Sequence, residues 1–121
     1  MNIYNILTNS ASQFGAKPAL IFKDQVISFA DLKTKVFQLT HGLASLQVSK
    51  STKIALFLPN GPEYVYSYLA SFCLGATVVP LDFMLKTEEL ISCLEHSETE
   101  VLIALAKSEV DLRQLKRACL P

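Results

Sequence analysis

Few residues in this 121-residue sequence have the type and spacing needed to bind a phosphate. A phosphate-binding loop needs closely spaced glycines, because side chains would hold the backbone amides away from the anion. The four glycines stand far apart, at positions 15, 42, 61 and 75. The sequence therefore contains neither G-x-G-x-x-G nor G-x-x-x-x-G-K-[ST], and we assign no cofactor-binding residue.

The histidines and one acidic stretch are the groups that could transfer a proton or hold a metal. His41 and His96 lie 55 residues apart, and no serine, cysteine or aspartate near either makes a triad pattern. We expect His41 on a helix surface and His96 as a cation near a helix C-terminus. The acidic stretch predicts a solvated helix face and loop, with a metal site as the alternative. Its members are Glu88, Glu89, Glu95, Glu98 and Glu100. We assign no catalytic and no metal-ligating residue.

Two turns are better placed to meet a ligand. Residues 58–61 and 80–82 follow predicted buried strands, and parallel sheets bind ligands beyond the carboxyl ends of their strands. Asn60 would also cap the next helix, with Glu63 as its partner, and free amides there could meet an anion. We favour a purely structural cap, because Asn60 and Glu63 would satisfy those amides themselves.

The aromatic and sulfur-containing side chains predict core packing. Tyrosines at 64, 66 and 68 cannot share one helix face at a spacing of two, so we expect at least one at the surface. Cys73 and Cys93 lie among apolar residues and are expected to be buried and unreactive, whereas Cys119 could be exposed. The three cysteines form no zinc or disulfide pattern, which favours a reducing, cytoplasmic setting.

The first half of the chain predicts two helices around a hairpin. A short amphipathic helix covers residues 3–14, and a hairpin joins residues 19–22 to 26–28. Ser28 opens a second helix, with Asp31 three residues later in a short version of the capping box. The inward residues expected on the first helix are Ile3, Ile6, Leu7 and Phe14. Those expected on the second are Phe29, Leu32, Val36, Leu39, Leu43 and Leu46.

From residue 53 onward the pattern alternates strand and helix. Apolar runs at 53–58, 77–80 and 100–104 predict strands, and the first of them is expected to be covered on both faces. The helices between them are expected to end at Gly75 and to begin at a Thr87 cap, and a last helix covers 108–119 with Leu112 and Leu115 inward. The fold class is therefore α/β, with a short parallel sheet flanked by helices in three layers.

Composition excludes several functional classes. Half of the residues are apolar and 18% are charged, which excludes a disordered tail. The formal net charge is 0, although residues 1–60 carry six lysines and two aspartates, and residues 61–121 carry five basic and nine acidic residues. Such a balance gives no electrostatic signal for nucleic acid. The N-terminus is no secretory signal, and the uncharged residues 64–81 predict a buried helix and strand rather than a membrane span.

The order of several short motifs resembles the N-terminal part of the AMP-forming acyl-CoA synthetases, or adenylate-forming ligases. The motifs are S-F-A-D-L at 28–32, K-I-A-L-F-L-P-N-G-P-E at 53–63, Y-L-A-S-F-C-L-G-A at 68–76 and V-V-P-L-D at 78–82. K-P-A-L-I before them and E-E-L-I-S-C-L-E-H-S-E after them fit the same succession. The resemblance covers residues 5–106 and rests on the joint order and spacing of the pieces.

This resemblance implies a carboxylic acid activated with ATP and Mg²⁺ to an acyl-adenylate, then commonly transferred to coenzyme A. The family's phosphate loop, Thr-Glu pair, ribose-binding Asp and C-terminal Lys have no counterpart in this sequence. No catalytic residue is therefore carried over, and no cofactor is expected to bind this chain alone. A fatty acid is the expected substrate, with aryl and amino acids left open.

We therefore expect residues 1–121 to be one partial domain, the N-terminal portion of an AMP-binding domain, and to be inactive alone. It could be a shortened chain, the product of a split gene or a degraded reading frame. The alternatives are a self-sufficient interaction module and a flavodoxin-type nucleotide-binding domain. The expected partners are the rest of the parent chain and a second copy joined through an exposed sheet edge, with a monomer closed by the last helix as the alternative.

Overall fold

A computed structural model describes residues 2–105 of the chain. The helix expected over residues 108–119, its Leu112 and Leu115, and Cys119 lie outside the described residues. The N-terminal elements are α1 (Ile3–Phe14), β1 (Pro18–Phe22), β2 (Gln25–Ser28) and α2 (Phe29–Ser45). The remaining elements are β3 (Lys53–Phe57), α3 (Pro62–Cys73), β4 (Thr77–Pro80), α4 (Thr87–Ser97) and β5 (Val101–Ala104).

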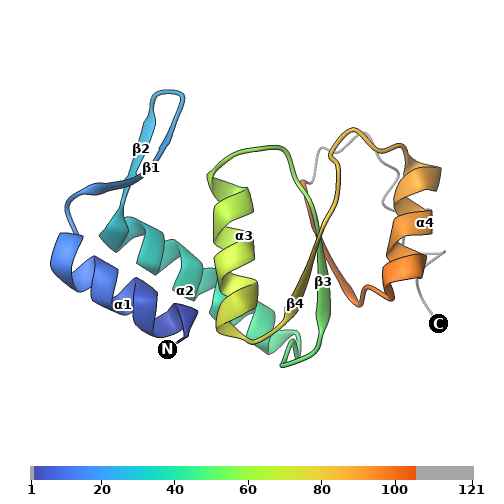
Figure 1. The fold of residues 1–121 in the computed structure, drawn as a ribbon, viewed down its shortest axis with the longest axis horizontal. Coiled ribbons are helices and arrows are strands. Elements are labelled where there is room, and N and C mark those ends of the chain that lie inside the picture. The colour runs from blue at the N-terminus through green and yellow to red at the C-terminus, as the bar shows by residue number, and fades with distance from the viewer. Residues whose placement is uncertain (1, 106–121) are drawn as a thin grey trace.

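The predicted α/β class and the parallel sheet are confirmed. Strand β3 lies between β4 and β5 and pairs with both in parallel, with Leu56 opposite Pro80 and Ile103. Helices α1, α2 and α3 lie on one side of this sheet and α4 lies on the other (Figure 1). Strands β1 and β2 form the separate antiparallel hairpin that the sequence predicts.

Strand β3 places alternate side chains in two cores. Ile54 and Leu56 pack with α1, α2 and α3, whereas Ala55 and Phe57 pack with Leu90 of α4 and other apolar residues on that side. These four side chains are buried, as expected for a strand covered on both faces. Strand β4 is less buried than predicted. Within the described residues it has a neighbouring strand on one side only, and Thr77 and Pro80 are exposed.

Three of the residues predicted to face inward are exposed. Ile6 and Phe14 of α1 are each more than two-fifths exposed, because α1 packs on α2 along a narrow stripe that buries only Leu7. Leu46 is 67% exposed, because α2 ends at Ser45 and Leu46 follows as its C-cap. The central positions Leu32, Val36 and Leu43 are buried as predicted.

The observed helix ends agree with the predicted ones except at the N-caps of α3 and α4. Gly75 follows α3 with a φ of 72°, the left-handed conformation that favours glycine at a helix end. Helix α3 begins at Pro62 with Gly61 as its N-cap, so Asn60 is not the predicted cap. Proline at the first helical position fixes φ for helix entry and moves the boundary one residue further. Helix α4 has Lys86 rather than Thr87 at its N-cap.

Ser28 caps α2 as predicted, and its removal should weaken the protein. Its hydroxyl accepts a hydrogen bond from the Asp31 amide at 3.1 Å. Ser28→Ala is expected to lower the free energy of unfolding by about 1 kcal/mol, the usual cost of losing such a cap. Ser92→Ala, at an exposed position on α4, is the control and should change it by less than about 0.5 kcal/mol in urea titrations. Equal effects of the two substitutions would contradict a capping role.

Candidate functional site

The carboxyl ends of β3 and β4 bring the two predicted turns to one edge of the sheet. The strands are parallel and hydrogen-bonded, and the Leu81 amide donates to the Leu56 carbonyl at 3.1 Å. The loops that follow both strands leave at the same end of the sheet (Figure 1). Residues 58–61 and 80–82 are therefore neighbours in space, as the strand order required.

The first turn positions Asn60 at the surface. Leu58 is buried and anchors the loop, whereas Pro59 and Asn60 are exposed. No side chain caps α3, and the Tyr64 amide donates to the Gly61 carbonyl at 3.2 Å. The predicted cap by Asn60 and Glu63 is therefore wrong.

The second turn is closed on itself. A carboxylate oxygen of Asp82 accepts a hydrogen bond from the Met84 amide at 2.8 Å, and the Asp82 carbonyl accepts one from Leu85. The Phe83 ring packs against Phe57, with 5.2 Å between ring centroids. Asp82 therefore shapes this loop and holds it over the second core.

Several backbone amides around these two turns are not free to bind a phosphate. A phosphate cradle needs several backbone amides free to donate to the anion. Pro62 has no amide hydrogen, and the amides of Tyr64, Met84 and Leu85 donate within their own turns. The Lys86 amide donates to the Glu89 carboxylate at 3.0 Å. Anchored by the buried Leu58 and by the Phe83 ring against Phe57, this edge places Asn60 and Asp82 at the surface.

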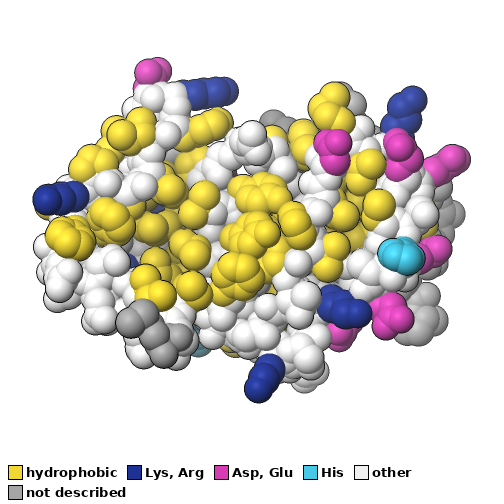
Figure 2. Space-filling model, in the orientation of Figure 1, with side chains coloured by type: hydrophobic (Ala, Val, Ile, Leu, Met, Phe, Trp, Pro, Cys, Tyr) yellow, Lys and Arg dark blue, Asp and Glu magenta, His cyan; other side chains and the backbone are white. Residues whose placement is uncertain are grey.

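The histidines and the acidic stretch lie on exposed helix faces and loops. His41 is exposed on α2, and His96 is exposed in the last turn of α4, as predicted. Acidic side chains gather over α4 in the space-filling view (Figure 2). Glu98 lies 3.9 Å from the Lys53 ammonium. Among residues 2–105, no group of three or more His, Cys, Asp and Glu side chains could hold a metal ion.

The tyrosines of α3 pack against the first core, as predicted, and none of the three is fully exposed. Tyr64 and Tyr68 stack with their ring centroids 5.8 Å apart, and Phe72 continues the row at 5.1 Å. Apolar side chains cover the part of the surface over α3 (Figure 2). Burial raises the pKa of Tyr64, and Tyr68 raises it further. Burial also raises the pKa of Tyr66, as do the carboxylates of Glu63 and Asp31.

The described cysteines are less buried than predicted. Cys73 and Cys93 are free thiols, and both are half-buried. Burial raises the pKa of the Cys73 thiol, against a hydrogen bond with Thr40 that lowers it. A thiol with a raised pKa is a weaker nucleophile at neutral pH, because the thiolate is the reactive form.

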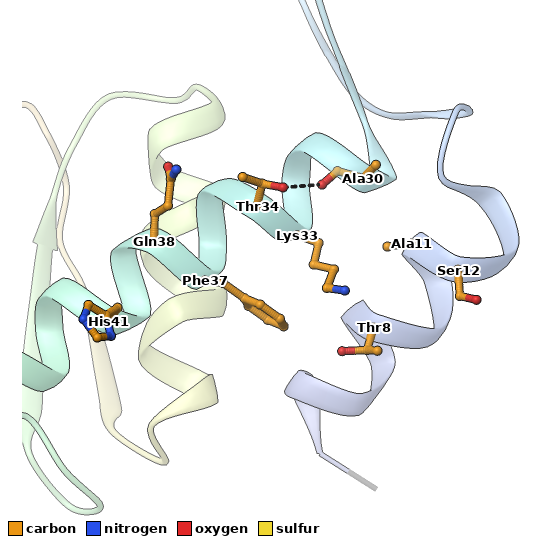
Figure 3. A pocket seen from close by; sticks show the side chains of 9 residues that line it. All are labelled: Thr8, Ala11, Ser12, Ala30, Lys33, Thr34, Phe37, Gln38 and His41. Carbon is orange, nitrogen blue, oxygen red and sulfur yellow. Dashed lines mark hydrogen bonds between the residues drawn. The ribbon is translucent and has the colours of Figure 1, made fainter.

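A groove lies between α1 and α2, lined by residues that no sequence motif links. It has a volume of about 940 Å³, and Thr8, Ser12, Lys33, Phe37, Gln38 and His41 are among the residues that line it (Figure 3). Nothing in the sequence indicates that this face of α2 meets α1. No described helix is long and apolar enough to cross a membrane.

A family of known sequences matches nearly the whole chain. The model of the AMP-binding enzymes covers residues 7–120. The crotonobetaine/carnitine–CoA ligase of Salmonella typhimurium is 26% identical over 121 residues, which is 96% of this chain and 23% of that protein. The long-chain-fatty-acid–CoA ligase of Bacillus subtilis is 31% identical over 103 residues, which is 85% of this chain and 18% of that protein.

Solved structures share the fold. The O-succinylbenzoate coenzyme A synthetase of Bacillus subtilis, in complex with ATP and magnesium ion, superposes with a TM-score of 0.84 at 29% identity. The match covers 97% of this chain and 31% of that structure. The chain therefore spans less than a third of these three proteins.

Proposed function

Because the chain belongs to the family of AMP-binding enzymes, we propose that it serves as the N-terminal part of an ATP-dependent acyl-CoA synthetase. Such an enzyme activates a carboxylic acid as an acyl-adenylate and passes the acyl group to coenzyme A. The observation that carries the proposal is the family match over residues 7–120, together with the same fold in an enzyme that binds ATP and magnesium. In this proposal residues 1–121 form one part of a larger AMP-binding domain.

A fatty acid is the proposed substrate class. The support is the 31% identity to a long-chain-fatty-acid–CoA ligase. The other two relatives described above are named as coenzyme A ligases of crotonobetaine and carnitine and of O-succinylbenzoate, so the chemistry shared by these three is a carboxylate joined to coenzyme A. A reducing cytoplasmic setting is also part of the proposal, and the free thiols of Cys73 and Cys93 support it.

The described residues support the reaction by positioning rather than by touching the reacting atoms. When bound to the whole enzyme, ATP and Mg²⁺ would supply the adenylating chemistry, and coenzyme A would supply the thiol that accepts the acyl group. In this chain, the buried Leu58 and Phe57 hold the two carboxyl-end turns in place. Holding reactive groups in the right geometry accounts for much of an enzyme's rate, and these turns are the part of that framework which the chain provides.

The chain alone is expected to form no acyl-adenylate. The reason is that its sequence holds no phosphate loop. The measurement is release of pyrophosphate and AMP from ATP with fatty, aromatic and amino acids. Turnover that depends on an added acid would contradict this expectation.

A longer protein that includes this sequence provides the positive control in the same assay. It should release pyrophosphate with at least one carboxylic acid and should do so fastest with a fatty acid. A long product inactive with every acid would remove the proposed synthetase function. It would favour the second candidate, a non-catalytic interaction module, for which the aromatic row on α3 is the supporting observation.

The proposed partners are the rest of the parent chain and a second copy, and strand β5 is the proposed contact. Amides in a parallel strand point alternately to its two neighbours. The Glu100 amide donates to the Lys53 carbonyl at 2.9 Å, so the amides of Val101 and Ile103 point away from β3. On β4, the Thr77 and Leu81 amides point toward β3, so Val78 and Pro80 are the positions that face outward. Pro80 has no amide hydrogen to offer to another strand. The outer edge of β5 is therefore better suited to pair with another strand.

A further inference from the structure

The groove between α1 and α2 carries a cation with no carboxylate partner. Lys33 extends from α2 toward α1, where Thr8 and Ser12 line the opposite wall (Figure 3). Lys33 is half-buried, and its ammonium lies 5.6 Å from the centroid of the Phe37 ring. Within the described part of the chain, the ion pair between Lys53 and Glu98 is the only one, and no acidic side chain lines the groove.

An unsatisfied hydroxyl lies in the same groove. The Thr8 hydroxyl oxygen is inaccessible to solvent and has no hydrogen-bond partner. Thr34, on the facing helix, instead donates to the Ala30 carbonyl at 3.1 Å. A buried polar group without a partner costs free energy, and native proteins satisfy nearly all such groups. An oxyanion that enters beside Lys33 could accept a hydrogen bond from the ammonium and, once a local movement uncovers the Thr8 hydroxyl, a second one from that hydroxyl.

Ala11, Ala30 and Phe37 form an apolar part of the lining that suits an apolar body attached to that anion. Besides Lys33 and Thr8, the remaining lining residues are polar, and they are Ser12, Thr34, Gln38 and His41. Ala11 and Ala30 are small and leave the space between the helices open. The Phe37 ring forms a flat wall, held by stacking on Tyr4 at 4.7 Å between ring centroids. Ligand sites commonly combine mostly apolar walls with a few polar groups that fix orientation. Apolar walls around one cation favour a carboxylate amphiphile over a small, fully hydrated ion.

We propose that the α1–α2 groove binds a carboxylate-bearing amphiphile, with Lys33 and Thr8 holding the carboxylate and Phe37, Ala11 and Ala30 contacting the apolar chain. This site is separate from the carboxyl edge of the sheet, since its residues come from α1 and α2 only. It does not depend on the proposed synthetase function. The bound state needs the Lys33 ammonium to turn from the Phe37 ring toward the carboxylate and the Thr8 hydroxyl to become accessible from the groove.

Octanoate is the test probe, with 1-octanol and inorganic phosphate as comparison ligands. Titration of the 121-residue chain, followed by NMR, should show saturable shifts of the Thr8 and Phe37 signals with octanoate. Octanol should bind at least tenfold more weakly because it lacks the charge, and phosphate should bind more weakly because it lacks the apolar chain. Equal responses to octanoate and octanol would overturn the proposed role of the cation.

Substitutions in α2 and α1 test whether octanoate binds in this groove or is attracted only by the positive charge of the helix. Lys33→Met should weaken octanoate binding about tenfold, whereas Lys35→Met, at an exposed position on the same helix, should change it less than twofold. Thr8→Val should weaken binding severalfold and, without ligand, should raise the melting temperature, because it removes an unsatisfied buried hydroxyl. Octanoate binding that is unchanged by Lys33→Met, or absent from the wild-type chain, would overturn the proposal.

Discussion

Phe57→Ala is expected to lower the free energy of unfolding by about 3–5 kcal/mol, the usual cost of removing a buried phenylalanine. Phe57 is 1% exposed and lies at the end of the central strand β3. Its side chain fills the second core between the sheet and α4, where it meets Phe83 and a cluster that includes Leu90 and Leu94. A small domain is stable by only about 5–15 kcal/mol, so this single change could remove much of its stability.

Urea titrations followed by circular dichroism provide the measurement. Met84→Ala is the control, because Met84 is 83% exposed and the substitution should change the free energy of unfolding by less than about 0.5 kcal/mol. Phe57→Ala should also loosen the Asp82 turn, since Phe83 loses its ring partner. A loss below about 1 kcal/mol would mean that the second core is not an essential part of the fold.

Elements whose residues carry a strong local pattern could be predicted from the sequence. Most of strand β3 is a continuous apolar run. Such a run is typical of a strand that is buried on both faces of a sheet. Gly75 marks the end of α3, because its positive φ strains any other residue. The parallel order then follows from strands that alternate with helices. In each case the information lies within a few residues of the element.

The errors arose where two local signals competed. Asn60 is a good N-cap residue and so is Gly61, but Pro62 already has the φ of the first helical turn, and this favours Gly61 as the cap. Leu46 continues the spacing of the apolar face of α2, yet the helix ends one residue earlier and leaves it exposed. Periodicity alone does not show where a helix stops.

The two candidate sites differ in how far the sequence could reveal them. The edge formed by residues 58–61 and 80–82 was predictable, because the carboxyl ends of adjacent parallel strands must meet. The α1–α2 groove was not, since it depends on how two helices separated by a hairpin pack against each other. Thr8 and Lys33 are 25 positions apart, and no motif links them. Only the packing places a buried hydroxyl in the same groove as a cation that has no carboxylate partner among the described residues.

The chain alone is expected to form a dimer at micromolar concentration through the outer edge of β5. An edge strand with unpaired amides is a template for another chain, and the Val101 and Ile103 amides point away from β3. A zero net charge provides little repulsion to oppose the contact. Sedimentation should show twice the mass of the chain. The Val101 and Ile103 amides should exchange more slowly with deuterium as concentration rises, whereas that of Val78 should not.

Two matched proline substitutions test which edge pairs. Ile103→Pro removes an outward amide of β5 and leaves the amides that bond to β3, so it should weaken dimerisation at least tenfold. Val78→Pro is the matched control, because it removes the corresponding outward amide of β4 and, like Ile103→Pro, replaces a half-buried, β-branched residue. It should leave the dimer intact, since β4 is not the proposed contact. Thermal unfolding of both variants checks that each is folded. A wild-type chain that sediments as a cooperative monomer, with Ile103 exchange independent of concentration, would show that the β5 edge is covered within the chain itself.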